Sequence, residues 1–253
     1  MEYLKDAVVL HIESLHLHEL IKCMETFEDF KISKQLLNAT IDLGFEKPTP
    51  VQQEAFNVIL SGKDMVGISQ TGTGKTFAYM LPILHDLKFS KQVTPRVLVL
   101  VPTRELVSQL VEKIELYTKY MTVRVLGVYG GTNINTQMQA VQQGCDILIS
   151  TPGRLYDLAL SNALKLKAIK KVVIDEVDVM LDLGFRPQLT NIMEILPTKR
   201  QHIMFSATMT EEVDELIENV FITPVKVSIA VSGTPLDNIS QSAYAVPNFY
   251  TKV

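Results

Sequence analysis

A glycine-rich segment, Ser-Gln-Thr-Gly-Thr-Gly-Lys-Thr, runs from residue 69 to residue 76 directly after a short apolar stretch. Gly72 and Gly74 permit backbone angles that direct successive amide groups at phosphate oxygens. We expect Lys75 to reach the β- and γ-phosphates of a nucleotide and the Thr76 hydroxyl to bind Mg²⁺. The full set of expected phosphate-binding residues is Gln70, Thr71, Gly72, Thr73, Gly74, Lys75 and Thr76. Serine replaces the usual first glycine, but a small residue suffices there, and the alternative is an ordinary surface turn.

Three carboxylates follow a second apolar run, Val-Val-Ile, at Asp175, Glu176 and Asp178. Because the carboxyl ends of parallel strands line the ligand crevice in α/β proteins, Asp175 is positioned to hold Mg²⁺ directly or through water. Glu176 can then orient or deprotonate an attacking water. A solvated acidic turn is the alternative, which becomes weaker once the phosphate loop is considered with it. The catalytic candidates are therefore Glu176, Lys75 and Asp175.

The rest of the chain supplies elements that can position these residues. From residue 64 onward, short runs rich in Val, Ile and Leu alternate with longer amphipathic stretches, which predicts strand-helix-strand units and a single α/β domain with a mostly parallel, roughly seven-stranded sheet. The expected strands are 64–68, 96–101, 123–129, 146–150, 171–175, 202–206 and 225–229, and the expected helices are 76–87, 104–120, 135–143, 154–160, 187–196 and 211–220.

Composition limits the classes of protein that this chain can belong to. The 253 residues are 47% apolar and 21% charged, which is enough to bury a substantial core, and no apolar run is long enough for a membrane span or a secretory signal. Cys23 and Cys145 lack metal-type spacing, so we expect reduced thiols in a cytoplasmic protein without membrane association. The net charge of −4 argues against a protein that coats nucleic acid, so any nucleic-acid contact must be local.

Both ends of the chain differ from the alternating middle. Residues 1–25 read as an extension, helical or partly disordered, in which His11, His16 and His18 are expected to be solvated and not a metal site. Residues 232–253 contain glycine and two prolines and read as a linker with one further strand at 240–246. The domain itself is expected to span residues 26–231.

Further motifs resemble the DEAD-box RNA helicases. The segment Gly-Phe-Glu-Lys-Pro-Thr-Pro-Val-Gln at residues 44–52, with Phe27 upstream, is similar to the adenine-selecting segment of that family. The resemblance implies that Gln52 hydrogen-bonds the adenine edge, that Phe27 stacks on the ring, and that Lys47 belongs to the cofactor-binding set. An amide can donate and accept at once, as the adenine edge requires.

Other family motifs follow in the family's order: Pro-Thr-Arg-Glu-Leu at 102–106, Gly-Gly at 130–131, Thr-Pro-Gly-Arg at 151–154 and Ser-Ala-Thr at 206–208. By resemblance, the RNA backbone is bound by Pro102, Thr103, Arg104, Gly131, Thr151, Gly153 and Arg154. The resemblance also implies that the hydroxyls of Ser206 and Thr208 bond to Asp178 and couple hydrolysis to strand separation. Taken singly, each motif could be ordinary turn or helix-cap chemistry.

The resemblance covers about residues 27–229 and is most like bacterial members, with Asp-Glu-Val-Asp where the family has Asp-Glu-Ala-Asp. It implies the amino-terminal, RecA-like lobe of an ATP-dependent RNA helicase that uses ATP and Mg²⁺ and closes on RNA together with a second RecA-like lobe. The motifs of that second lobe do not occur in these residues, and residues 240–253 resemble its start, so we expect this chain alone to be a nearly inactive monomer. The alternatives are a DNA-directed translocase of the same superfamily and a non-catalytic RNA- or ATP-binding clamp.

Overall fold

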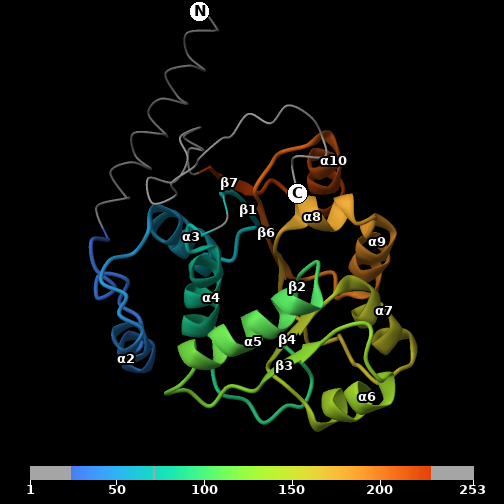
Figure 1. Ribbon diagram of the computed structural model, residues 1–253. Coiled ribbons are helices and arrows are strands. Elements are labelled where there is room, and N and C mark those ends of the chain that lie inside the picture. The colour runs from blue at the N-terminus through green and yellow to red at the C-terminus, as the bar shows by residue number, and fades with distance from the viewer. Residues whose placement is uncertain (1–23, 71, 229–253) are drawn as a thin grey trace, which may run out of the picture.

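Seven parallel strands form the centre of the molecule in the computed structural model, which describes residues 24–70 and 72–228 (Figure 1). The strands are β1 (Met65–Ile68), β2 (Val97–Leu100), β3 (Val125–Val128), β4 (Ile147–Ser150), β5 (Lys171–Ile174), β6 (Gln201–Ser206) and β7 (Val225–Ser228). Their order across the sheet is β3-β4-β2-β5-β6-β1-β7, and every pairing is parallel. The predicted α/β class with a parallel sheet is confirmed.

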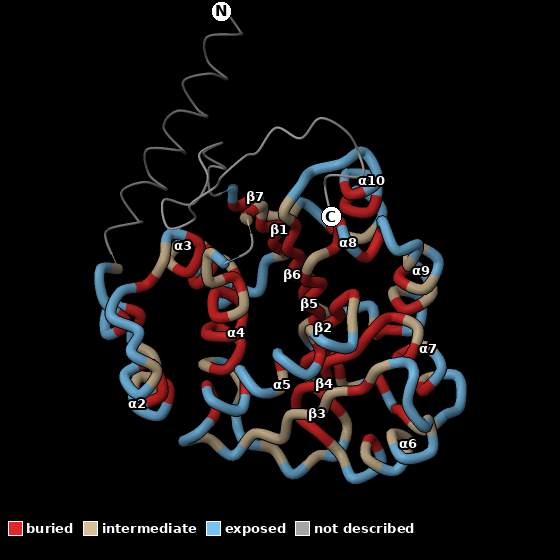
Figure 2. The backbone as a smooth tube through the Cα atoms, viewed as in Figure 1, coloured by how far each residue is buried: buried red, intermediate tan, exposed pale blue. Residues whose placement is uncertain are grey.

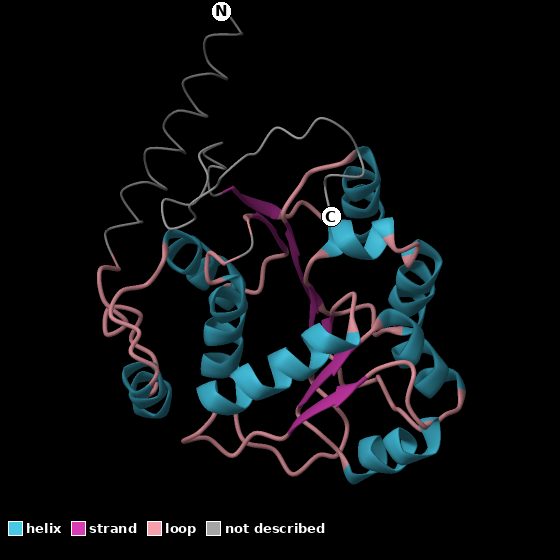
Figure 3. Ribbon diagram, viewed as in Figure 1, coloured by secondary structure: helices cyan, strands magenta, loops and turns pink. Residues whose placement is uncertain are grey.

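Nine helices in the described residues surround the sheet (Figure 3). They are α2 (Lys34–Asp42), α3 (Pro50–Leu60), α4 (Lys75–Asp86), α5 (Arg104–Tyr117), α6 (Ile134–Gln143), α7 (Pro152–Leu160), α8 (Val177–Asp182), α9 (Arg186–Ile195) and α10 (Glu211–Val220). None of the helices in the described part of the chain is long and apolar enough to cross a membrane.

Alternating side chains of the buried strands pack into two separate hydrophobic cores, one on each face of the sheet. In β2, Val97 and Val99 pack with α2, α3, α4 and α5, while Leu98 and Leu100 pack with α6 to α10. Figure 2 shows the strands buried between these two layers. A period of two residues with both faces apolar is the pattern of a strand covered on both sides, and it explains why the strands read as continuous apolar runs.

The strand order decides which loops meet at the carboxyl edge of the sheet. The ends of β5, β6 and β1 are neighbours, and they lead into the acidic segment, the Ser-Ala-Thr segment and the glycine-rich loop. The ends of β3, β4 and β2 are neighbours on the other half, and they lead into the Gly-Gly, Thr-Pro-Gly-Arg and Pro-Thr-Arg-Glu-Leu segments. The two groups of motifs therefore occupy adjoining halves of one edge.

The predicted strands agree with the observed ones to within two residues at each end, and the six predicted helices are all present. Three helices were not predicted, namely α2, α3 and α8. The first two helices precede the regular alternation. The third, α8, begins inside the acidic motif, where the three carboxylates obscure the amphipathic pattern that would predict a helix. Residues 1–23, Thr71 and residues 229–253 lie outside the described residues, so the expected extension, its histidines and the linker stay predictions, as does the domain range 26–231.

Candidate functional site

The glycine-rich loop joins β1 to α4 and is closed by its own hydroxyl groups. The Ser69 and Thr73 hydroxyl oxygens lie 2.6 Å apart, and the Thr73 hydroxyl also donates to the Gln70 carbonyl at 3.0 Å. Ser69 is buried and its amide donates to the carbonyl of Ser206. Serine at the usual glycine position thus fits the loop and adds a bond that glycine could not make.

Two glycines of this loop have left-handed backbones, with φ of +83° at Gly72 and +90° at Gly74. Gly74 is the residue immediately before α4, so the amino end of that helix opens at the loop. Side chains with a Cβ rarely adopt such angles, which explains glycine at both positions. Free amides at a helix start favour an anion at this place.

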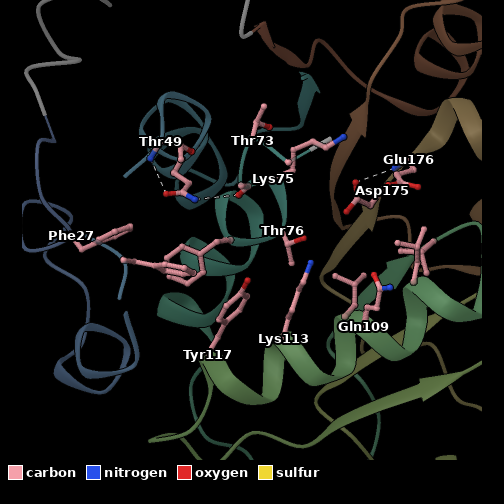
Figure 4. A pocket seen from close by; sticks show the side chains of 18 of the residues that line it. Phe27, Thr49, Thr73, Lys75, Thr76, Gln109, Lys113, Tyr117, Asp175 and Glu176 are labelled. Atoms are coloured by element: carbon pink, nitrogen blue, oxygen red, sulfur yellow. Dashed lines mark hydrogen bonds between the residues drawn. The ribbon is translucent and has the colours of Figure 1, made fainter. Parts of the chain in front are cut away.

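Lys75 and the two acids line one pocket of about 500 Å³ (Figure 4). The Lys75 side chain is buried, and its Nζ has no hydrogen-bond partner within the described residues. A buried ammonium without a partner is costly unless a ligand supplies one. Thr76, Gly72, Thr73 and Gly74 line the same pocket, whose volume suits a nucleotide-sized ligand.

Asp175 follows β5 directly and faces α4. Its carboxylate accepts hydrogen bonds from the Tyr79 hydroxyl at 2.9 Å and from the Glu176 amide at 3.0 Å. Burial raises the pKa of Asp175, and the positive charge of Lys75 offsets this only in part. Tyr79 was not predicted from the sequence, although it lies one helical turn after Lys75.

Glu176 has a left-handed backbone, with φ of +55° and ψ of +50°, which is rare for a residue with a side chain. Partial burial raises the pKa of its carboxylate, and the neighbouring charge of Asp175 raises it further. Strain of this kind persists only where the surroundings hold it, and it gathers at functional sites. Val177, where the resembled family has alanine, is the first residue of α8 and is fully buried.

Asp178 of α8 holds the segment that follows β6. One carboxylate oxygen accepts hydrogen bonds from the amides of Ala207 and Thr208, at 3.1 and 3.0 Å, and from the Thr208 hydroxyl at 2.9 Å. The expectation that Ser206 does the same is wrong, because its hydroxyl donates to the Thr208 carbonyl at 2.6 Å. Only one of the two hydroxyls therefore contacts the acid.

The other end of the pocket is aromatic. Phe27 lines it but is only 4% exposed, because it packs edge to face on Phe77 at 5.7 Å and near Phe45. Gln52 also lines the pocket, and its amide oxygen accepts from the Thr49 amide at 3.0 Å while its amide nitrogen donates to the Gly74 carbonyl at 3.3 Å. Gln52 therefore links the start of α3 to the phosphate loop.

Several pocket residues were not identified from the sequence. Lys47 lines the pocket as expected, whereas Gln70 lies outside the lining. Most of the missed lining residues come from the aromatic end and from α5, and the full set is Phe45, Thr49, Phe77, Val101, Leu106, Gln109, Leu110, Lys113 and Tyr117. The amphipathic spacing of residues 104–117 indicates that one face of α5 packs inward, but it does not indicate that this face lines a pocket. Burial raises the pKa of Tyr117 to about 12.

On the other half of the edge, most of the residues expected to bind RNA lie at the starts of helices. Thr103 is the N-cap of α5 and its hydroxyl accepts from the Leu106 amide, and Thr151 is the N-cap of α7. Pro102 is buried, Gly131 is exposed with φ of +82°, and a Cβ at Gly153 would meet nothing within 4 Å. Open backbone beside helix starts suits the approach of a phosphate.

The two arginines of this half differ. Arg104 is exposed and pairs with its neighbour Glu105 at 2.7 Å. Arg154 is buried, and its guanidinium donates to the Gln137 side chain at 2.8 Å and to the Thr132 carbonyl at 2.9 Å. Arg104 therefore lies at the surface, where a phosphate can reach it, whereas the hydrogen bonds of Arg154 stabilise the segment after β3.

Comparisons with known proteins agree with this geometry. The sequence model of the DEAD/DEAH box helicase family matches residues 49–216. The chain is 38% identical over 229 residues to DEAD-box ATP-dependent RNA helicase 24 of Oryza sativa subsp. japonica, covering 89% of this chain and 30% of that protein. It is 38% identical to RNA helicase CrhR of Synechocystis sp. over 90% of this chain and 46% of the relative.

A third relative is ATP-dependent RNA helicase DeaD of Escherichia coli, which is 40% identical over 222 residues, 87% of this chain and 35% of DeaD. The chain spans less than half the length of each of these three relatives. The family match covers the phosphate loop, the acidic motif and the Ser-Ala-Thr segment, which is most of the region described above. The chain belongs to the DEAD/DEAH box helicase family.

Proposed function

We propose that this chain is the ATP-binding lobe of an ATP-dependent RNA helicase, which binds ATP with Mg²⁺ and the RNA backbone and drives local RNA unwinding together with a second RecA-like lobe. The observation that carries the proposal is the buried Lys75 ammonium, which has no partner within the described residues and lies in a pocket with acids at one end and aromatic rings at the other. A polyphosphate is the ligand that such an ammonium lacks.

The residues of the pocket fit ATP and Mg²⁺. A Cβ at Gly74 would come within 2.6 Å of the Gln52 side chain, so glycine lets the phosphate loop pack directly against the residue proposed to read the base. The Thr76 hydroxyl and the Asp175 carboxylate are hard oxygen ligands of the kind that Mg²⁺ prefers, and both line the pocket. When bound, Mg²⁺ would neutralise charge that develops on the phosphates.

Each side chain then has a distinct task. Lys75 binds the β- and γ-phosphates, and Glu176 accepts a proton from the attacking water, a task that its raised pKa favours by making the carboxylate a stronger base. Gln52 reads the adenine edge by exchanging its present bonds for bonds to the base. Phe27 is buried but lines the pocket, and we propose that it contributes to the aromatic end that receives the adenine ring.

RNA is proposed to bind at the other half of the edge, through Thr103, Arg104, Gly131, Thr151 and Gly153. Their hydroxyls, amides and single exposed guanidinium recognise phosphate and carry no sequence information. Asp178 and Thr208 connect the nucleotide half to the segment after β6, which is a route for coupling. Ser206 stabilises that segment through the hydrogen bond of its hydroxyl to the Thr208 carbonyl.

The second lobe is proposed to close over both halves and supply an arginine, which in comparable sites is worth about 10³–10⁵ in rate. This chain alone should therefore bind nucleotide weakly, hydrolyse it very slowly and unwind nothing. We further propose a cytoplasmic location and a monomeric state for this lobe.

The decisive experiment is calorimetric titration of ATP, ADP and GTP, each with Mg²⁺, into the wild type and a Gln52→Ala variant. Gln53→Ala is the matched control, because Gln53 is the next residue and its amide donates to Pro48 at 3.2 Å, outside the pocket. We expect adenine preference in the wild type and in Gln53→Ala, and its loss in Gln52→Ala. Equal binding of GTP by the wild type, or no binding at all, would contradict the proposal.

Two alternative functions, a non-catalytic clamp and a DNA-directed translocase, are distinguished from the proposed one by measuring the activity of the protein joined to its second lobe. A non-catalytic clamp should function unchanged after Glu176→Gln, whereas a helicase should lose turnover and keep nucleotide binding. A DNA-directed translocase should be stimulated by DNA, whereas the proposed enzyme should be stimulated by RNA alone.

A further inference from the structure

One face of α5 forms a wall of the nucleotide pocket. Its residues lie at positions i, i+3, i+4, i+7 and i+11, so they share a side of the helix, and they are Leu106, Gln109, Leu110, Lys113 and Tyr117. The apolar members of this set are buried or partly buried, whereas Gln109 and Lys113 are exposed. Figure 4 shows the Lys113 side chain extending from α5 toward Thr76, with its amino group directed into the pocket.

Lys113 makes no ion pair within 4.0 Å and no hydrogen bond within the described residues. Its positive charge nevertheless acts on the acidic end of the pocket, where it lowers the pKa of Asp175 against the larger raising effect of burial. An exposed lysine with no fixed partner that lies near a carboxylate is free to turn toward a stronger anion.

The charges that line the pocket are those of Lys47, Lys75, Lys113, Asp175 and Glu176, which sum to +1. Without Lys113 this sum is zero. A polyphosphate is the most strongly anionic part of a nucleotide, so an added cation in the wall favours its binding. Lys75 and Lys113 also come from different helices, α4 and α5, so they can contact the polyphosphate from two sides.

We propose that Lys113 is a second phosphate-binding cation, which binds the polyphosphate of the nucleotide from α5 while Lys75 binds it from α4. The inference rests on the proposed function, because it assumes that a nucleotide occupies this pocket. The two lysines differ in kind. Lys75 is buried, whereas Lys113 is exposed and reaches the ligand by its long side chain.

The test uses calorimetric titration of adenosine, AMP, ADP and ATP into the wild type, Lys113→Met and Lys113→Arg. Methionine keeps an unbranched side chain and removes the charge, and arginine keeps the charge. Lys165→Met is the matched control, because Lys165 is exposed, precedes β5 and lies outside the pocket. Urea unfolding of each variant without ligand checks that the fold is unchanged.

We expect Lys113→Met to lower the affinity for ATP about tenfold, at the low end for a charged hydrogen bond because the site is open to water. The loss should shrink from ATP to AMP and vanish for adenosine, and the dependence of ATP affinity on salt should become weaker. Lys113→Arg should restore most of the affinity, and Lys165→Met should match the wild type.

Two results would overturn the inference while leaving the proposed function intact. One is a Lys113→Met variant that binds ATP as tightly as the wild type does. The other is an equal loss of affinity for adenosine and ATP, which would assign Lys113 to the shape of the pocket and not to the phosphates. Failure of the wild type to bind any adenine nucleotide would overturn the proposed function as well, so the two failures are distinguishable.

Discussion

Gly74 joins the glycine-rich loop to Gln52, the residue that we propose reads the adenine, and the replacement of Gly74 by alanine tests whether the loop and Gln52 act as a unit. Its backbone has φ of +90°, and a Cβ there would lie 2.6 Å from the Gln52 amide nitrogen. That nitrogen also donates to the Gly74 carbonyl at 3.3 Å. Gly72 is the matched control, because it has nearly the same φ, +83°, and a Cβ there would meet nothing within 4 Å.

The expected magnitudes follow from these two geometries. An L-residue with a left-handed backbone costs about 1–2 kcal/mol, and this applies equally to Gly72→Ala and Gly74→Ala. Gly74→Ala must in addition displace the Gln52 amide and lose its hydrogen bond, which adds about 0.5–1.5 kcal/mol. We therefore expect the free energy of unfolding to fall by about 1–2 kcal/mol in Gly72→Ala and about 1.5–3.5 kcal/mol in Gly74→Ala.

Urea unfolding measures the stability, and calorimetric titration of ATP and GTP measures how each variant selects its base. Gly72→Ala should weaken both nucleotides by a similar factor, because it changes only the phosphate loop. Gly74→Ala should weaken ATP more than GTP, because Gln52 is displaced from its place beside the base. If both variants keep the same ratio of ATP to GTP affinity, Gln52 and the loop are not coupled as argued.

Three other perturbations test the rest of the site and its support. Tyr79→Phe removes a donor to the buried Asp175 and should lower the free energy of unfolding by about 1–3 kcal/mol in urea, with no loss expected if that bond is absent in solution. Asp146→Ala leaves two arginines without their buried partner and should cost about 3–5 kcal/mol by calorimetry. Burial raises the pKa of Asp146, but the hydrogen bonds of those arginines lower it more, so the net shift is downward. The contribution of Asp146 to the free energy of unfolding is therefore present above pH 3.8 and is lost as the pH falls through the lowered pKa. Acid unfolding of the wild type and of Asp146→Ala measures this difference. At position 176, Glu176→Gly relieves the left-handed backbone and Glu176→Ala does not, so the glycine variant should be more stable by about 0.5–1 kcal/mol, and equal stabilities would deny the strain.

The strands and the phosphate loop could be predicted because their signals are local. A buried parallel strand reads as a continuous apolar run. The loop begins with a small residue, Ser69, and needs glycine three and five residues later, at Gly72 and Gly74. The assignment of Asp175 to the ligand crevice followed from the same rule, since it comes directly after such a run. These inferences need only the residues themselves and the rule that ligands bind at the carboxyl ends of parallel strands.

The partners of the site residues could not be predicted, because they depend on how distant segments meet. Nothing near Tyr79 in sequence indicates that its hydroxyl reaches Asp175, which is 96 residues away. The RNA contact of Arg154 stays a prediction, but nothing in its motif indicates that two of its guanidinium nitrogens donate to Gln137 and Thr132, which both belong to the segment after β3. An arginine in a turn motif reads the same whether its side chain faces the solvent or the protein.

The strand order also explains why α5 is the element that joins the two halves of the site. The helix follows β2, whose neighbours are β4 on the side of the RNA-type loops and β5 on the side of the acids. Its first turn is capped by Thr103, in the half proposed to bind RNA, and its inner face carries Lys113 into the nucleotide pocket two turns later. A ligand at either end of α5 therefore acts on the same rigid helix. If RNA and nucleotide bind as proposed, a small shift of α5 on RNA binding would change the distance between Lys113 and the polyphosphate. We therefore propose α5 as a second connection between the two proposed sites, in addition to the contact of Asp178 with the segment after β6.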